Sequence, residues 1–359
     1  NAMTTIPDAV FEPQWTVGAN RSTSISGNPF DAPTRDRLIA YSASGHSDFG
    51  YGPTISHNIN VLTRNAQLQR AASDLSPWLP LGETQAQTSA RTQQWQLLQG
   101  AGGNVRDFFE TLALFVDSRN QRSAQDWANL VHRVWTLIDQ MLANTALRET
   151  LLNRVFREER SCGDGAMVLL ENMEVEVLVH EALNNVGEAQ RGAELFSLAR
   201  RLFRLRQVDL LSAAEVARRV AAGGNPDAAE VILFYRVELA QPLDLPTRAR
   251  TMLYATIAGV SAQQITAARD TVLAMEGSPA FMHAIMQEKF WRNFLLNTYA
   301  DRFAAIEADY QRDYTKLTEE TGLSDEVELQ RGSELTLARD QQINRLIEEL
   351  TLQAYNSPS

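Results

Sequence analysis

Cysteine is almost absent from this chain of 359 residues, which contains one, Cys162. A single cysteine excludes an internal disulfide and a zinc site built from several thiolates. The five histidines include no pair four residues apart, so a helical histidine metal site is not expected either. We therefore predict a protein without a metal or cofactor that works in a reducing compartment.

Long apolar runs and basic clusters are also missing. No uncharged apolar stretch approaches the roughly 18 residues that a membrane span requires. The chain has 33 basic and 44 acidic residues, a formal net charge of −11, and lacks a basic block that would neutralise nucleic-acid phosphates. No glycine-rich motif has the spacing of a nucleotide-binding loop. These absences argue against a membrane span and against binding of nucleic acid or nucleotide.

Proline is unevenly distributed, since seven of the twelve prolines lie in the first 80 residues and none lies between 81 and 225. A proline inside a helix costs about 3 kcal/mol, so a long stretch without it favours helices. Apolar residues there recur at helical spacing, as at Val105, Phe108, Phe109 and Leu112. No alternating strand pattern occurs after residue 80. The sequence therefore predicts an all-α body.

Capping residues predict where several of these helices begin. Ser212 with Glu215 three residues later forms a capping-box pattern, and Asn225 precedes a proline as an N-cap does. Residues 248–260 follow a Leu-Pro-Thr start and are expected to form one helix. From 279 to 355 the pattern predicts two or three long helices with a turn near Gly322.

The first 80 residues differ from the rest, being rich in Ser, Gly, Asn and Pro with little periodicity. Residues 1–3 are typical of an expression remnant. The string Ser24–Phe30 resembles the closing turn of a leucine-rich repeat. We expect residues 4–40 to be the end of a leucine-rich-repeat region and 41–83 a linker, with the preceding repeats removed.

The sequence supports neither of two possible hydrolase sites, a Ser-His-Asp triad or a Cys-His pair. The stretch Gly45–Gly50 places Ser, His and Asp side by side, but neighbours in sequence seldom form a triad and no strand precedes them. A Cys-His protease would need a histidine near Cys162. His180 lies 18 residues further along a predicted helix, roughly 27 Å away at 1.5 Å per residue.

Cys162 itself is the remaining candidate for chemistry. A free cysteine is more often a small buried hydrophobic residue, but Cys162 lies in a glycine-rich break before a helix predicted from Ala166. The positive end of that helix, with Arg157 and Arg160, lowers a thiol pKa, whereas Asp164 opposes this effect. Asp164 makes better sense as a base for a second, cationic reactant such as a lysine amine.

The residues around this cysteine resemble the NEL family of bacterial ubiquitin ligases, the C-terminal catalytic domains of leucine-rich-repeat effectors of the IpaH and SspH type. The family's Cys-x-Asp loop matches Cys162–Asp164, and its Leu-Val-His string matches Leu178–His180. Glu230–Tyr235 and Leu243–Pro246 look like the helices that follow in the family. The similarity keeps the family's order throughout a domain that we expect over 84–356.

The resemblance implies a multi-helix catalytic domain with long C-terminal helices, without metal or cofactor. Cys162 would accept ubiquitin from a host ubiquitin-conjugating enzyme and pass it to a lysine of a host protein chosen by the missing repeats, with Asp164 taking a proton from the amine. It also implies type III secretion into the host cytoplasm. The family usually has Arg where this chain has Gly165. The alternative is therefore a non-catalytic helical interaction module, with a structural Cys162 or decayed ligase activity.

Overall fold

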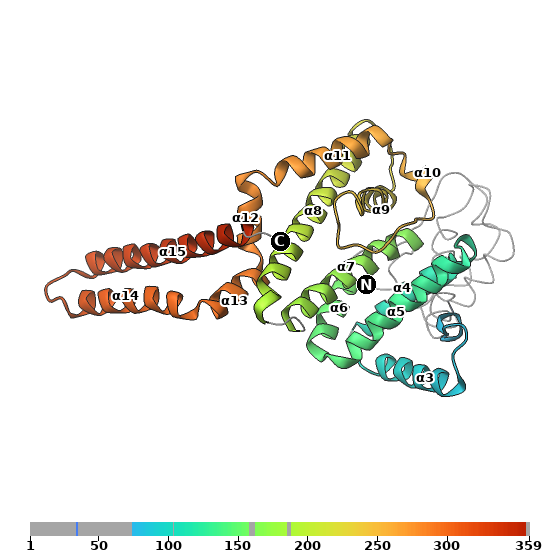
Figure 1. Cartoon of the computed structure of the whole chain (residues 1–359), viewed down its shortest axis with the longest axis horizontal. Helices are drawn as coiled ribbons and strands as arrows, with labels where there is room; N and C mark the ends of the chain where they lie inside the picture. Colours follow the sequence, from blue (N-terminus) through green and yellow to red (C-terminus); the bar gives the residue numbers. More distant parts are fainter. Residues whose placement is uncertain (1–33, 35–73, 103, 158–161, 185–187, 357–359) are drawn as a thin grey trace. The chain divides into compact units, whose positions relative to one another are not determined.

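In the computed structural model, helices are the regular secondary structure found in the described part of the chain (Figure 1), which confirms the all-α prediction. The described residues are 34, 74–102, 104–157, 162–184 and 188–356. They belong to two compact units, 1–132 and 133–359, whose boundary falls within helix α5 (Ala124–Ala143). The expected repeat remnant at 4–40, the Gly45–Gly50 stretch and most of the linker lie outside the described residues. Among those described, no helix is long and apolar enough to cross a membrane.

The first unit is organised around aromatic side chains. It contains α3 (Gln85–Gln99), α4 (Val105–Asp117) and the beginning of α5. Trp78 is fully buried, with its ring centroid 5.1 Å from that of Trp127, whose indole N–H donates to the carbonyl of Pro77 over 3.3 Å. Since an indole pair buries much apolar area, these contacts fix the segment that leads into α3.

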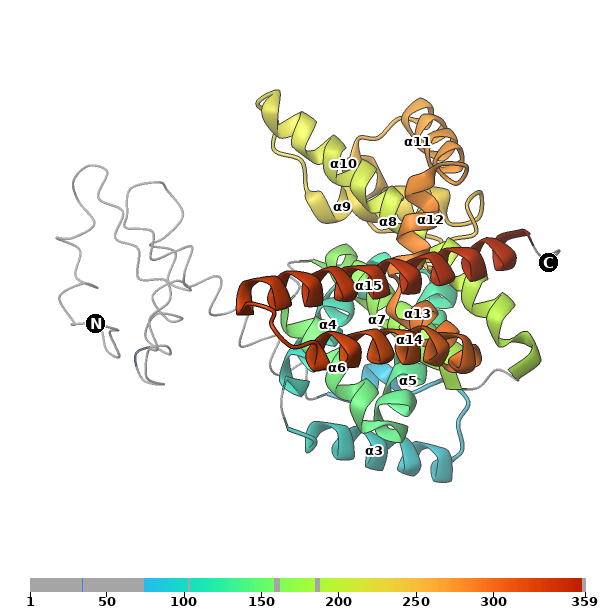
Figure 2. The ribbon, with the colours of Figure 1, turned by 90° about the vertical axis from the view of Figure 1, so that its left-hand side faces the viewer.

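The second unit holds the remaining helices. They are α6 (Thr145–Arg157), α7 (Gly163–Asn184), α8 (Glu188–Ala221), α9 (Ala228–Leu239), α10 (Ala255–Ala258), α11 (Ala262–Met275), α12 (Pro279–Gln287), α13 (Lys289–Thr298), α14 (Ala300–Glu319) and α15 (Asp325–Asn356). Figures 1 and 2 both show α14 and α15 side by side as an antiparallel pair. Their connection contains Gly322 at φ +93°, a conformation that favours glycine. The two long C-terminal helices therefore agree with the sequence.

The helix start expected at Ser212 is wrong. Helix α8 continues through this position, and the Ser212 hydroxyl donates to the carbonyl of Asp209 over 2.8 Å. Inside a helix, serine commonly bonds back to a carbonyl of the preceding turn instead of capping. Glu215 pairs with Arg218 and Arg219 rather than closing a capping box.

The N-cap of helix α9 lies two residues after the expected one, Asn225. Asp227 is the N-cap, and its carboxylate accepts hydrogen bonds from the backbone N–H groups of Ala229 at 3.0 Å and Glu230 at 3.4 Å. A carboxylate at this place interacts more strongly with the helix dipole than a neutral amide.

The helix expected over 248–260 is also wrong, because only the short α10 forms there. Most of the segment 243–259, which we call the strap, has no helical hydrogen bonds of its own. Arginines of α8 bind its two ends: Arg204 donates to the carbonyl of Leu243 over 2.8 Å, and Arg219 donates to Ala258 and Gly259 over 2.6 and 2.8 Å. These side chains satisfy backbone groups that a helix would have satisfied internally.

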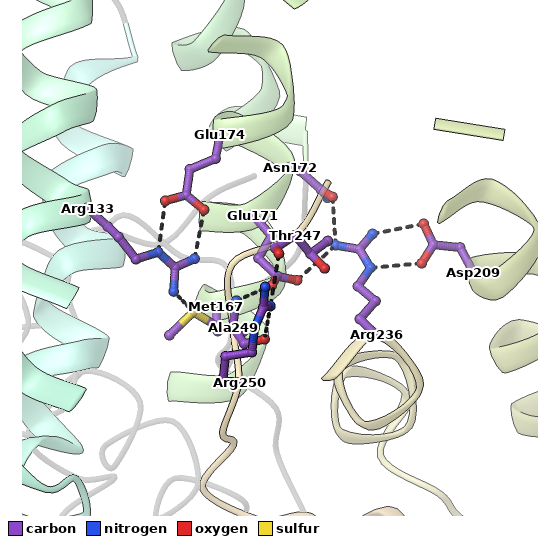
Figure 3. A network of polar contacts seen from close by, with 10 residues as sticks. All are labelled: Arg133, Met167, Glu171, Asn172, Glu174, Asp209, Arg236, Thr247, Ala249 and Arg250. Atoms are coloured by element: carbon purple, nitrogen blue, oxygen red, sulfur yellow. Dashed lines mark hydrogen bonds and ion pairs between the residues drawn. The ribbon is translucent and has the colours of Figure 1, made fainter. Parts of the chain in front are cut away.

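A buried ionic network holds the middle of the strap against α7, α8 and α9 (Figure 3). Arg236 donates two 2.8 Å hydrogen bonds to Asp209 and one of 2.9 Å to Asn172, and its guanidinium lies 3.5 Å from Glu171. Glu171 is fully buried and accepts the backbone N–H of Ala249 at 2.9 Å. Burial raises the pKa of Glu171, and the charge of Arg236 opposes that rise. The network therefore connects three helices to the strap.

Candidate functional site

Cys162 is the N-cap of α7. Its carbonyl accepts the N–H of Ala166 at 3.0 Å, and its Sγ accepts the N–H of Gly165 at 3.3 Å. The sulfur thus takes the place that a serine or threonine oxygen takes in ordinary caps. Gly163 and Gly165 lie inside the first turn of α7, so the helix begins earlier than the glycines suggested. The thiol is held at the positive end of a 22-residue helix.

The Cys162 side chain is half-buried, and this partial burial has the largest effect on the pKa of its thiol. Burial raises the pKa of the Cys162 thiol, and the carboxylates of Glu230 and Asp227 raise it further. The backbone N–H groups of Gly165 and Asp164 act in the opposite direction without reversing the outcome. The expected lowering by the helix end is therefore present but outweighed, and the resting thiol keeps its proton at neutral pH.

Asp164 is fully buried beside the cysteine and binds the strap. Its carboxylate accepts the N–H of Leu253 at 2.9 and 3.1 Å and the N–H of Tyr254 at 3.1 Å. Both oxygens are therefore engaged by main-chain donors. Asp164 and Glu171 lie seven residues apart on one face of α7, so two carboxylates of the same helix hold the strap.

Glu230 is a site residue that the sequence did not single out. The Cys162 thiol donates to its Oε1 over 3.7 Å, although the two residues are 68 positions apart. Glu230 is 3% exposed. Burial, followed by the hydrogen bond and charge of Asp164, raises the pKa of Glu230 to about 8. One signal was available, since Glu230 is an acidic residue in the otherwise apolar run that opens α9.

The raised pKa of Glu230 should make the free energy of unfolding depend on pH. Its folded pKa lies above the usual 4.5, so the folded chain binds a proton that the unfolded chain releases between pH 4.5 and about 8. The contribution of Glu230 to stability is fully present below pH 4.5 and is lost as the pH rises through about 8. Relative to Glu230→Gln, the wild-type chain should therefore lose free energy of unfolding from pH 5 to pH 8, measured by urea denaturation.

Comparing the two proteins at each pH cancels the titration of groups that do not interact with Glu230. The exposed Glu238 on the same helix offers a matched control, because Glu238→Gln should leave the pH dependence unchanged. A difference between wild type and Glu230→Gln that stays constant from pH 5 to pH 8 contradicts the raised pKa.

The histidine considered for a protease is engaged elsewhere. His180 Nε2 lies 3.0 Å from Nδ2 of Asn144, while the side-chain partner of Cys162 is Glu230.

Within the described ranges, no group of three His, Cys, Asp or Glu residues could hold a metal ion. Gly165 is buried in the first turn of α7. The side chains of Arg157 and Arg160 lie outside the described part of the chain.

The fold and the site together define an all-helical domain built around one capping cysteine and two buried carboxylates. The family model described as "C-terminal novel E3 ligase, LRR-interacting" matches residues 78–302. The chain belongs to this family, which confirms the family predicted from the sequence.

Three relatives illustrate the similarity. The E3 ubiquitin-protein ligase ipaH7.8 of Shigella flexneri is 24% identical over 364 residues, covering 98% of this chain and 60% of the relative. The probable E3 ubiquitin-protein ligase ipaH4.5 of the same organism is 24% identical over 362 residues, covering 98% and 59%. The E3 ubiquitin-protein ligase ipaH9.8 of Shigella dysenteriae serotype 1 (strain Sd197) is 24% identical over 343 residues, covering 92% and 59%. The chain thus spans about 60% of the length of these relatives.

Proposed function

We propose that this chain is a cysteine-dependent ubiquitin ligase that carries ubiquitin on Cys162. The observation that supports this most directly is the placement of the only cysteine, half-exposed at the N-terminus of α7, with Glu230 and Asp164 beside it. Membership of the novel E3 ligase family and the names of the relatives support the same reaction. The helical body would serve to hold these groups in place.

The first half-reaction moves ubiquitin between two sulfurs. Cys162 Sγ attacks the thioester carbonyl on a ubiquitin-conjugating enzyme, a new C–S bond forms, and the departing cysteine takes up the proton that Cys162 releases. Since one thioester replaces another, the ligase supplies position and an accessible sulfur more than driving force. A thiol that is protonated at rest fits a site that becomes reactive only when the charged enzyme docks.

The second half-reaction joins ubiquitin to a lysine and requires an acid-base group. A free lysine amine has a pKa near 10.4, so the attacking nitrogen must lose protons at neutral pH. Asp164 is the proposed base, acting from the buried carboxylate pair that it forms with Glu230. Its bonds to Leu253 and Tyr254 would keep that charge beside the sulfur.

The biological setting follows the relatives as a proposal. The partners would be ubiquitin, a host ubiquitin-conjugating enzyme and a host protein recognised by leucine-rich repeats, after secretion of the effector into the host cytoplasm. The ligase domain would occupy 84–356, with a repeat remnant at 4–40 and a linker at 41–83. The relatives extend well beyond the matched region, which leaves length for such repeats.

The decisive experiment is a short reaction of the chain with ubiquitin, ATP, activating enzyme and a panel of conjugating enzymes, analysed on non-reducing gels. A band heavier by about one ubiquitin that disappears with reductant is expected with at least one conjugating enzyme. If every conjugating enzyme fails to give this band while remaining charged itself, the chain is better described as an interaction module with a structural cysteine.

Asp164→Asn should separate the two half-reactions. Loading of Cys162 should stay within about threefold of wild type, because the sulfur and its cap remain. Discharge to free lysine should slow by about 10²-fold, the usual cost of a lost general base. Single-turnover chase of the preloaded adduct measures this step.

Glu171→Gln is the matched control, because Glu171 holds the same strap at Ala249 without contacting Cys162. It should discharge several times faster than Asp164→Asn. Equal losses in both variants would assign Asp164 to holding the strap rather than to proton transfer.

A further inference from the structure

One oxygen of Glu230 has no donor in the described part of the chain. Oε1 receives the Cys162 thiol, whereas Oε2 is buried and no N–H or O–H group donates to it. An ionised carboxylate with an unsatisfied buried oxygen is costly. A neutral carboxylic acid removes the cost, because its O–H can donate to the neighbouring Asp164, whose oxygens already accept backbone N–H groups. The site therefore favours a neutral Glu230 beside Asp164, with Oε1 of Glu230 3.7 Å from the Cys162 sulfur.

We propose that Glu230 is a second acid-base residue of the transfer reaction, which as a neutral acid gives its proton to Cys162 Sγ when the thioester breaks. This inference rests on the proposed function. Glu230 qualifies as a catalytic residue because its Oε1 contacts the reacting sulfur. Asp164 supports it by holding the charge that keeps Glu230 protonated.

Protons and electrons balance when ubiquitin passes from Cys162 to a lysine with Glu230 as the acid. The lysine ammonium first loses one proton to solvent, and the neutral nitrogen then bonds to the thioester carbonyl carbon. The C–S bond breaks, and its electron pair goes to Sγ. The nitrogen loses one proton to the Asp164–Glu230 pair, and Glu230 delivers one proton to Sγ. The products are an amide and a free thiol, and the pair returns to its starting protonation. No further reactant is needed.

Relative acidities favour this direction. The pKa of Glu230 is raised to about 8, while burial and the nearby carboxylates raise the pKa of the Cys162 thiol above its ordinary value of 9.0. A protonated Glu230 therefore transfers its proton downhill to the thiolate. The ionisable groups that face Glu230 are Cys162 and Asp164 from α7 and Asp227 at the start of its own helix.

The test compares wild type with Glu230→Gln, which keeps the side-chain shape but cannot release an acidic proton. After loading, discharge to trifluoroethylamine is followed from pH 6.5 to 9.5, because this acceptor stays neutral and removes amine ionisation from the profile. The variant should load within about threefold of wild type and discharge at least about tenfold more slowly at pH 7. The wild-type discharge rate should fall above pH 8, and this fall should be missing in Glu230→Gln.

Two further variants keep the test decisive. Glu238→Gln changes an exposed glutamate of the same helix and should behave as wild type. Glu230→Asp keeps the acid but withdraws it by one methylene, so it should discharge at an intermediate rate and retain the fall above pH 8. If Glu230→Gln does not fold, the profile of Glu230→Asp decides, and an unchanged rate there overturns the proposal.

The inference is also overturned if folded Glu230→Gln discharges as fast as wild type, or if loading is lost to the same extent as discharge. These outcomes differ from failure of the proposed function, in which the wild-type chain itself forms no reductant-sensitive adduct.

Discussion

A chain carrying Cys162→Ala is expected to form no ubiquitin thioester and no ubiquitinated product. The physical reason is that alanine removes the only thiol of the chain, so no other residue can carry a thioester. The measurement is the non-reducing gel used for wild type, followed by a long reaction with a lysine-containing acceptor. Ligase activity that persists in this variant would falsify the assignment of Cys162.

Loss of activity must be separated from loss of structure, because Cys162 also caps α7. Removing a cap costs about 1 kcal/mol of stability. Cys162→Ser is the matched control, since its hydroxyl can accept the same Gly165 N–H while being a much weaker nucleophile. The serine variant should unfold close to wild type and still fail to transfer ubiquitin to lysine. Recovery of transfer with serine would indicate that the cap, rather than the thiol, is essential.

Among the variants proposed for this chain, Arg236→Met should lose the most free energy of unfolding. Arg236 is 4% exposed and neutralises Glu171 and Asp209. Removing one partner from a buried ion pair costs about 3–5 kcal/mol, because the remaining charge loses its compensation. The uncompensated charge would be most costly at Glu171, because this residue is fully buried and holds the strap at Ala249. Urea denaturation followed by circular dichroism measures the change.

Two variants show whether this loss comes from the network. Arg269 pairs with Asp270 on the solvent-exposed side of α11, so Arg269→Met should change stability far less. Adding Glu171→Gln to Arg236→Met should recover part of the loss, because it removes the orphaned charge. A loss no greater than that of Arg269→Met, or the absence of any recovery, would contradict the importance of the network.

The sequence was sufficient for those parts of the fold that depend on neighbouring residues. Helical spacing placed α4, in which Val105, Phe108, Phe109 and Leu112 are buried. The same local information identified Cys162 and Asp164 as candidates, because two residues that are two positions apart stay together in any fold. Their catalytic roles remain predictions.

The parts that could not be predicted depend on contacts between distant segments. Glu230 meets Cys162 only because α9 packs against α7, and no local pattern records that pairing. The segment 248–260 has helical composition, yet its N–H groups bind Asp164 and Glu171 from 78 to 90 positions away. Sequence periodicity describes how a segment would bond to itself, so it misses a segment that bonds to side chains elsewhere.

The path of the strap is determined mainly by residues that lie outside it. Arg204 and Arg219 of α8 and the carboxylates of α7 bind its main-chain atoms, and Arg201 of α8 adds an ion pair with the Asp244 side chain. Main-chain atoms are the same for nearly every amino acid. Substitutions at exposed strap positions such as Arg248 and Thr251 should therefore be tolerated more readily than substitutions at Asp164, Glu171, Arg204 or Arg219, which hold the strap from outside. The outer surface of this segment is thus free to change its chemistry, and with it the proteins it meets, while the arrangement at Cys162 persists.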